Sequence, residues 1–440
     1  MAPLARLLCL NGGAAKPMPL SSPTRPADVS ARGGDWSALL DPLDAGLRAE
    51  LLKYGDLAQA TYDGFDRHHW SPHCGTCLYG LRRLLPALGL AGHGYAATAF
   101  VYATCDVDVP RWLERPLHAE AWDGHANWIG YVAVAGAAEA KRAGYRDIVV
   151  AWRGTIAPDE WLLDMKTRMV PFEVDAGKDR GAMVAEGFHS MYTSSRAESK
   201  YGARSAREQV AGELARLVGH FRGRGGEEVR VTVTGHSLGG ALAMLAARDA
   251  AAAHPGVPVR AVTFSAPRVG NRAFCDGLAS RGVRVLRVVV RHDVVPTVPS
   301  VPRAVLDAPV SKPLAKLWAL AGRPPAWAYV HVGDELELDV TKSPFLKHAY
   351  DAQGFHNLEV CLHLLDGRES AAGAFRRPER DVALVNKTSG MLRDEARIPA
   401  WWYEPANKGL ARDALGRWVL GERAHDDLPV PDDRLPLSEL

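Results

Sequence analysis

The sequence predicts an α/β protein with a mostly parallel central sheet flanked by helices. Short runs rich in β-branched residues alternate with helical segments, which is typical of β-α-β units. One such run ends at Gly235-His236-Ser237-Leu238-Gly239-Gly240, and strong helix formers follow at once. The expected strands are 95–104, 127–134, 146–152, 228–234, 260–265 and 283–290.

The remaining elements follow from hydrophobic periodicity. Leucines at helical spacing between Leu39 and Leu52 predict an N-terminal helix, and a second helix is expected over 205–217, ahead of the fourth strand. The proline-rich stretch 298–325 is typical of a surface excursion. After it, the runs 327–332 and 335–339 predict a late hairpin.

Composition limits the classes of function. Hydrophobic residues make up 47% and charged residues 24% of the 440, which are ordinary values for a soluble globular protein. A net charge of +2 without a basic stripe argues against a nucleic-acid partner. No apolar stretch approaches the ~18–20 residues that span a bilayer. Any membrane contact is therefore expected to be peripheral.

Six cysteines are too few for a disulfide-framed fold of this length. Cys74 and Cys77 lie close together, so a local disulfide between them is one interpretation. We favour the other interpretation, two thiols in a loop. A structural zinc site would need a second Cys/His pair at suitable spacing, and the other cysteines are scattered.

The two ends differ in composition from the middle. Residues 1–27 contain no acidic residue but do contain basic residues, serines and prolines, which favours a transit peptide over 1–34; a disordered tail without targeting function is the alternative. The acidic, proline-rich segment 422–440 is expected to be disordered. A folded domain is then expected over 35–421.

The motif around Ser237 predicts a strand–turn–helix elbow. The turn is so sharp that Gly235 and Gly239, two positions on either side of the serine, must lack side chains; His236 and Leu238 flank it directly. A serine held in this way is a nucleophile if a base accepts its proton and a carboxylate orients that base.

The expected partners follow the serine in the order Asp, then His. Asp293 is the best carboxylate because it comes just after a strand, whereas Asp276 lies in a helical stretch and Asp339 in the expected hairpin. His356 is the preferred base, since it precedes a helix in a loop. His363, on the polar side of that helix, and His331, in a strand, are the alternatives.

Backbone amides must also stabilise the oxyanion. One donor is expected from Leu238 and the other from Thr155, which follows the end of a strand. The amphipathic segment after Pro158 places Trp161, Leu162 and Met165 on one face. These three residues could form a lid that meets lipid, or they could pack in the core.

Together these motifs resemble the lipase class 3 family. They occur in the family's order at 150–155, 235–240, 265–271 and 293–296. Further segments at 40–44, 54–60, 127–134 and 356–359 resemble the plastid class I members of the plant phospholipase A1 branch. The resemblance extends from about Trp36 to Val419.

The resemblance implies an α/β-hydrolase fold with Ser237, Asp293 and His356 as catalytic residues and Thr155 and Leu238 as oxyanion hole. It also favours His356 over His363. The implied reaction is hydrolysis of the sn-1 acyl ester of glycerolipids such as phosphatidylcholine, galactolipids or triacylglycerol, without a metal or organic cofactor. The resemblance to plastid members also implies a chloroplast location. If residues 1–34 are no transit peptide, the expected location is the cytoplasm.

Two other functions are compatible with the residues. A lipase-like scaffold without catalysis would usually lack a triad member, yet every required residue type is present. An esterase for small esters would share the triad, and an apolar lid with a long acyl groove would favour lipid instead. The oligomeric state cannot be read from the sequence.

Overall fold

The computed structural model describes residues 36–68, 71–104, 126–155, 166–172, 179–223, 227–299, 328–368, 374–403, 410–412, 414–420 and 423–440. Within these ranges, no helix combines the length and apolar character needed to cross a bilayer.

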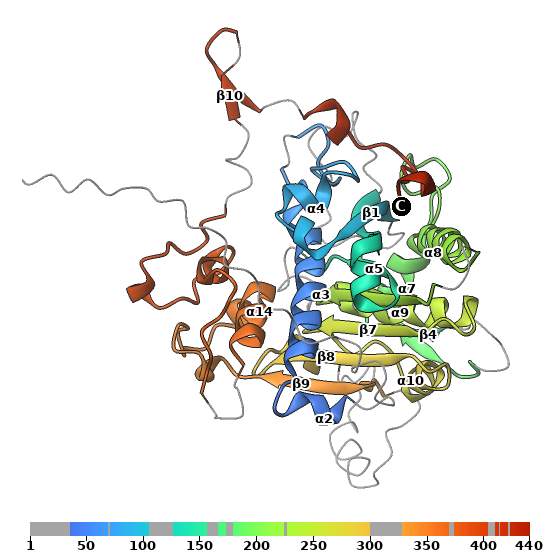
Figure 1. The fold of residues 1–440 in the computed structure, drawn as a ribbon, viewed down its shortest axis with the longest axis horizontal. Helices are drawn as coiled ribbons and strands as arrows, with labels where there is room; N and C mark the ends of the chain where they lie inside the picture. The colour runs from blue at the N-terminus through green and yellow to red at the C-terminus, as the bar shows by residue number, and fades with distance from the viewer. Residues whose placement is uncertain are drawn as a thin grey trace, which may run out of the picture.

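A seven-stranded sheet forms the centre of the molecule (Figure 1). Its order is β1-β2-β3-β6-β7-β8-β9. The pairs β1–β2 and β2–β3 are antiparallel, and the pairs β3–β6, β6–β7, β7–β8 and β8–β9 are parallel. The strands are β1 (Tyr95–Thr104), β2 (Ala126–Ala135), β3 (Arg146–Trp152), β6 (Val229–His236), β7 (Val259–Phe264), β8 (Arg284–Val290) and β9 (Asp334–Leu338). The predicted mostly parallel sheet is confirmed.

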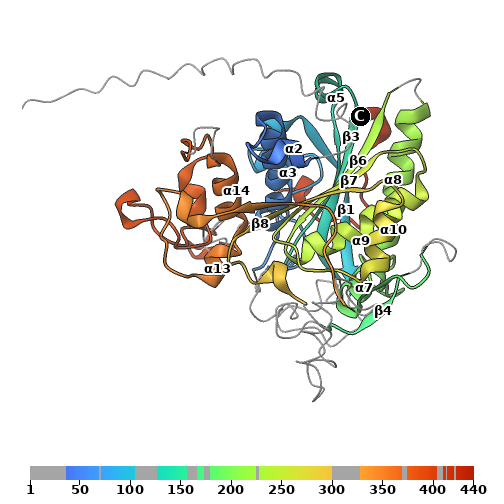
Figure 2. The ribbon, with the colours of Figure 1, turned by 90° about the horizontal axis from the view of Figure 1, so that it is seen from below.

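Helices cover both faces of this sheet (Figure 2). One face carries α3 (Ala45–Asp63) and α14 (Leu358–Gly367), and the other carries α8 (Ala206–Gly223), α9 (Leu238–Ala253) and α10 (Arg272–Ala279). The shorter helices are α2 (Ser37–Leu40), α4 (Leu84–Ala87), α5 (Ala137–Ala143), α7 (Glu186–Thr193) and α13 (Ala352–Phe355). Two small hairpins pair β4 (Met169–Pro171) with β5 (Met183–Ala185), and β10 (Leu410–Arg412) with β11 (Trp418–Leu420).

The strands supply two cores because successive side chains point to opposite faces. In β3, Ile148 and Val150 pack in the core below α8 and α9, whereas Val149 and Ala151 pack in the core below α3 and α14. Burial on both faces explains why these strands read as nearly continuous apolar runs. This layered arrangement is that of an α/β-hydrolase.

The expected hairpin at 327–339 is wrong. Its second run forms β9, which pairs parallel with β8, and Val330 makes only a single bridge to Gly270. The chain between β8 and β9 is long enough for the crossover that a parallel pair needs. Pairing with β8 also buries Leu336 and Leu338 in the core below α3 and α14, which a hairpin on the surface would not do.

The segment 423–440 does not match the disorder expected from its composition. It lies along the edge strand β1, where the Leu435 amide donates to the Thr98 carbonyl at 2.9 Å and the Leu435 side chain is buried. Its acidic residues pair with arginines of the domain, as in Arg82–Glu439 and Arg83–Asp427. Composition alone misses this because a few apolar anchors and matched charges hold the segment in place; Leu437 and Leu440 also pack against the core.

Candidate active site

Ser237 stands at the junction of β6 and α9, with φ 58° and ψ −129°. Non-glycine residues rarely adopt such a conformation, and strain of this kind is found mainly at functional sites. A side chain on Gly235 would overlap the backbone of Gly239, and one on Gly239 would overlap the carbonyl of Trp152. The structure thus has the sharp elbow that the sequence predicts.

The structure brings the three residues predicted for the triad together. His356 Nε2 lies 2.8 Å from Ser237 Oγ, and His356 Nδ1 lies 2.8 Å from Asp293 Oδ2. All three side chains are buried. Asp293 follows β8, and His356 occupies the short loop between α13 and α14, so three separate elements meet at the carboxyl edge of the sheet.

The partners fix where the protons lie. The Asp293 carboxylate accepts from the Val295 amide through Oδ1, at 2.9 Å, and has Oδ2 left to accept from His356. A carboxylate only accepts, so His356 carries its proton on Nδ1. Nε2 is then free to accept the proton of the Ser237 hydroxyl, which is the arrangement that activates a serine.

The two alternative histidines lie elsewhere. His363 is buried and bonds through Nε2 to the Ser343 hydroxyl at 2.8 Å; burial lowers its pKa to about 4. His331 donates from Nε2 to the Pro296 carbonyl at 2.7 Å, and burial lowers its pKa to about 3. Both are neutral structural histidines at pH 7.

The alternative carboxylates are also accounted for locally. Asp276 pairs with Arg272 one turn away on α10, and both side chains are exposed. Asp339 accepts from the Thr341 amide and from Arg291 after β9. Neither carboxylate bonds to any histidine that the structure describes.

The loop with Thr155 lies directly against the elbow. A Cβ added to Gly154 would come within 2.6 Å of the His236 carbonyl and 3.1 Å of Ser237 Cβ. Thr155 is buried, and its hydroxyl has no hydrogen-bond partner among the described residues. Leu238 is the first residue of α9, and the first amides of a helix have no partner within it. Donors from both segments are thus available beside Ser237.

Arg153 anchors this loop. Its buried guanidinium donates to the carbonyls of Trp128 and Gly154, each at 3.1 Å, and lies 4.0 Å from the centre of the Phe65 ring. Burial lowers the pKa of Arg153 to about 10, so the group stays charged at neutral pH.

The expected lid residues Trp161, Leu162 and Met165 lie outside the described residues. Two exposed apolar side chains of the described residues, Val294 and Tyr350, adjoin members of the triad, and we call them the rim. Val294 follows Asp293 in the sequence, and the Tyr350 ring contacts Phe355, the neighbour of His356. Val294 is 41% exposed and Tyr350 is 67% exposed.

Sequence reasoning missed one functional candidate, Tyr62 at the end of α3. Its hydroxyl lies 2.7 Å from His236 Nδ1. Nothing in the local pattern marks this tyrosine, because its partner is 174 residues away along the chain.

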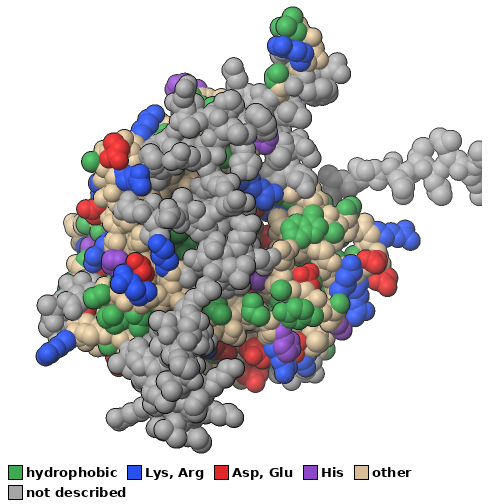
Figure 3. All heavy atoms as spheres, turned by 180° about the vertical axis from the view of Figure 1, so that it is seen from behind, with side chains coloured by type: hydrophobic (Ala, Val, Ile, Leu, Met, Phe, Trp, Pro, Cys, Tyr) green, Lys and Arg blue, Asp and Glu red, His purple; other side chains and the backbone are tan. Residues whose placement is uncertain are grey.

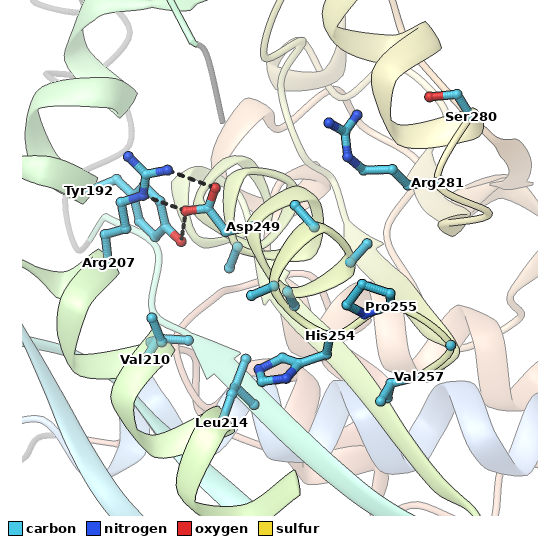
Figure 4. Close-up of a pocket in the computed structure, with 17 residues that line it drawn as sticks. Tyr192, Arg207, Val210, Leu214, Asp249, His254, Pro255, Val257, Ser280 and Arg281 are labelled. Carbon is cyan, nitrogen blue, oxygen red and sulfur yellow. Dashed lines mark hydrogen bonds and ion pairs between the residues drawn. The ribbon is translucent and has the colours of Figure 1, made fainter. Parts of the chain in front are cut away.

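A cavity of about 840 Å³ between α8, α9 and α10 is not the active site (Figure 4). Its Arg207 and Tyr192 both bond to Asp249, and its Arg281 pairs with Asp179, so these charges are balanced within the protein. Asp249 lies twelve residues after Ser237, which is about 18 Å along α9.

The described side chains on one face of the molecule give no electrostatic sign of a polyanionic partner. On the face in Figure 3, Lys and Arg side chains are interspersed with acidic and apolar ones.

In the part of the chain that the structure describes, no cluster of His, Cys, Asp and Glu has the geometry of a metal site. Cys74 and Cys77 are free and buried, and burial raises the pKa of both thiols to about 12.

Comparison with known proteins assigns the family. The family model "Lipase (class 3)" matches residues 149–302. Phospholipase A1-Igamma1, chloroplastic, of Arabidopsis thaliana is 42% identical over 92% of this chain and 80% of its own length. Phospholipase A1-II 6 of Oryza sativa subsp. japonica is 43% identical over 89% of this chain and 94% of its own.

Among solved structures, the lipase from Rhizopus microsporus var. chinensis aligns with 68% of this chain and 76% of its own, at 21% identity and a TM-score of 0.41. The two plant relatives cover nearly the whole chain at more than 40% identity. This chain therefore belongs to the class 3 lipase family, in its plant phospholipase A1 branch, and is a lipid ester hydrolase.

Proposed function

We propose that this protein hydrolyses the sn-1 acyl ester of glycerolipids, with phosphatidylcholine as the first candidate and galactolipids and triacylglycerol as further candidates. The observation that carries the proposal is the continuous hydrogen-bonded chain from Ser237 through His356 to Asp293, with both links at 2.8 Å. The names of the phospholipase A1 relatives support the choice of the sn-1 ester.

In this mechanism Ser237 Oγ attacks the ester carbonyl while His356 Nε2 accepts its proton. Asp293 stabilises the imidazolium that forms. The amides of Leu238 and Thr155, with the Thr155 hydroxyl, stabilise the developing oxyanion. His356 then protonates the leaving lysolipid, and a water activated by the same imidazole releases the fatty acid from Ser237.

The rim supports a lipid substrate rather than a small ester. Val294 adjoins Asp293, and Tyr350 contacts the neighbour of His356, so exposed apolar side chains accompany both partners of the serine. We infer that this rim contacts the lipid surface and that the protein binds membranes peripherally. The complete triad argues against a non-catalytic scaffold, since such a protein has no need of a strained serine.

Replacing Ser237 by Ala removes the nucleophile. Release of fatty acid from phosphatidylcholine labelled at sn-1 should fall at least about 10³-fold, because triad members are worth this much or more. Ser280→Ala, in the cavity between α8, α9 and α10, is the matched control and should keep full activity. Activity retained in Ser237→Ala would contradict the nucleophile, and release from sn-2 alone would contradict the sn-1 assignment.

Replacing Thr155 by Val removes only the hydroxyl that lacks a partner in the described residues. We expect kcat to fall by about 10- to 100-fold with little change in KM, since one oxyanion donor acts mainly in the transition state. Thr155→Ser keeps the hydroxyl and should retain most of the activity. Steady-state kinetics on a soluble ester measure both; equal kcat for the Val and Ser variants would rule out a role for the hydroxyl.

Replacing Tyr350 by Ser removes an exposed ring from the rim. Sedimentation with phosphatidylcholine vesicles should show about 5- to 10-fold weaker binding, as expected for losing part of one aromatic side chain from an apolar contact. Hydrolysis of a soluble ester should stay unchanged. Val430→Ser is the control, because Val430 is 53% exposed in the segment along β1, away from the rim. If both variants bind alike, the rim is not the contact surface.

We further propose a chloroplast location directed by residues 1–34. The relatives named chloroplastic support this, as does the absence of acidic residues before Asp28. Residues 1–34 fused to a fluorescent protein should enter isolated chloroplasts and be shortened by processing, whereas the chain from residue 35 should not. Exclusion of the fusion would instead favour the cytoplasm.

A further inference from the structure

His236 connects two parts of the active site without touching the reacting atoms. Its side chain is buried between α3 and the loop that holds His356. On one side, Nδ1 lies 2.7 Å from the Tyr62 hydroxyl; on the other, Nε2 lies 2.8 Å from the backbone carbonyl oxygen of His356. The rings of His236 and His356 are 4.6 Å apart between centroids.

The partners determine the protonation of His236. The carbonyl oxygen of His356 can only accept, so His236 must carry a proton on Nε2. Burial lowers the pKa of His236 well below its usual value, and the neighbouring His356 lowers it further. The ring is therefore neutral at pH 7, and Nδ1 accepts the hydroxyl proton of Tyr62.

Tyr62 extends the chain to the oxyanion loop. The Tyr62 hydroxyl lies directly against Gly154, whose backbone has an electrostatic influence on it. The space that a Cβ of Gly154 would need is taken by this hydroxyl, so the two groups are in close contact. Two hydrogen bonds thus join Tyr62 through His236 to His356, and a close contact joins Tyr62 to Gly154.

We propose that Tyr62 and His236 are positioning residues that hold the backbone of His356 in register with the loop of Gly154 and Thr155. The inference rests on the proposed triad and deepens it. Proton transfer requires His356 near Ser237 while the donor from Thr155 stays beside the same serine, and both residues lie on loops. A misplacement of 1 Å in such a site can cost about 10²-fold in rate.

Two substitutions of His236 test the link. His236→Met fills a similar volume but cannot donate to the His356 carbonyl, whereas His236→Gln keeps an N–H at about the same distance from the backbone. The readouts are the rate at which a p-nitrophenyl alkylphosphonate modifies Ser237, and kcat and KM on a soluble ester. We expect His236→Met to lower the phosphonylation rate and kcat by about 10- to 100-fold, with KM within about twofold.

His236→Gln should recover most of this loss. If His236 had a merely structural role, the activity of each variant would follow its thermal stability, and KM and kcat would change together. Phosphonylation of His236→Met at the wild-type rate, or a Gln variant as slow as the Met variant, would overturn the proposal.

Tyr62→Phe tests the outer half of the chain and remains informative if a His236 variant does not fold. It should slow phosphonylation by about 3- to 10-fold, because Nδ1 of His236 loses the donor that fixes its tautomer. Tyr131→Phe is the control: Tyr131 is a buried tyrosine whose hydroxyl donates to the Leu57 carbonyl at 2.8 Å, without a bond to the triad among the described residues. Equal rates for the two phenylalanine variants would contradict the chain.

The double variant Tyr62→Phe/His236→Met should be no slower than His236→Met alone, since the two residues act in series. Rates that fall by the product of the single effects would show independent roles. Phosphonate needs no lipid recognition, so a wild-type protein that reacts with it at Ser237 but releases no sn-1 fatty acid would count against the proposed substrate alone.

Discussion

The structure depends on one imidazole meeting two partners at once. His356 must present Nδ1 to a carboxylate that follows β8 and Nε2 to a hydroxyl that follows β6, and both contacts measure 2.8 Å. Neither strand can supply both partners. The parallel sheet solves this geometric problem because the carboxyl ends of its strands lie at one edge. The residues that follow those ends are thereby brought together although they are distant along the chain.

The opposite end of the sheet is built to be rigid rather than reactive. At the start of β3, the buried Asp147 accepts hydrogen bonds from Tyr54, Tyr95 and Thr232, each at 2.8 Å. Fully satisfied buried networks of this kind favour a single arrangement of the elements that they join. Tyr54 and Tyr62 both lie in α3, so the same helix braces the sheet at one end and contacts His236 at the other.

Much of this could be predicted from the sequence because the signals are local. The strand before Ser237, the glycines around it and the helix after it are contiguous. The inner strands β3, β6 and β7 are runs buried almost throughout on both faces. Asp293 could be found because it follows a strand end. The choice of His356 over His363 needed the family resemblance as well. The sequence pattern places His363 on a polar helix face, but in the structure this face is covered, and the buried Glu359 on it pairs with Arg380.

The rest could not be predicted because it depends on contacts that no local pattern encodes. The two runs within 327–339 resemble a hairpin in sequence. In the structure the second run pairs with the edge of β8 instead, a contact that the local pattern does not encode. The charged segment 423–440 reads as disordered until its arginine partners, hundreds of residues earlier, are known. The link from Tyr62 through His236 to a backbone carbonyl of His356 likewise has no sequence signature, since a carbonyl is present at every residue.

The most direct test of the central claim is a crystal structure of the protein after reaction with a lipid-like phosphonate. The account predicts phosphorus bonded to Ser237 Oγ, with one phosphonyl oxygen about 3 Å from the amides of Leu238 and Thr155. The imidazole of His356 should remain between that serine and Asp293. A phosphonate on another residue, or a His356 ring turned away from both partners, would contradict the account.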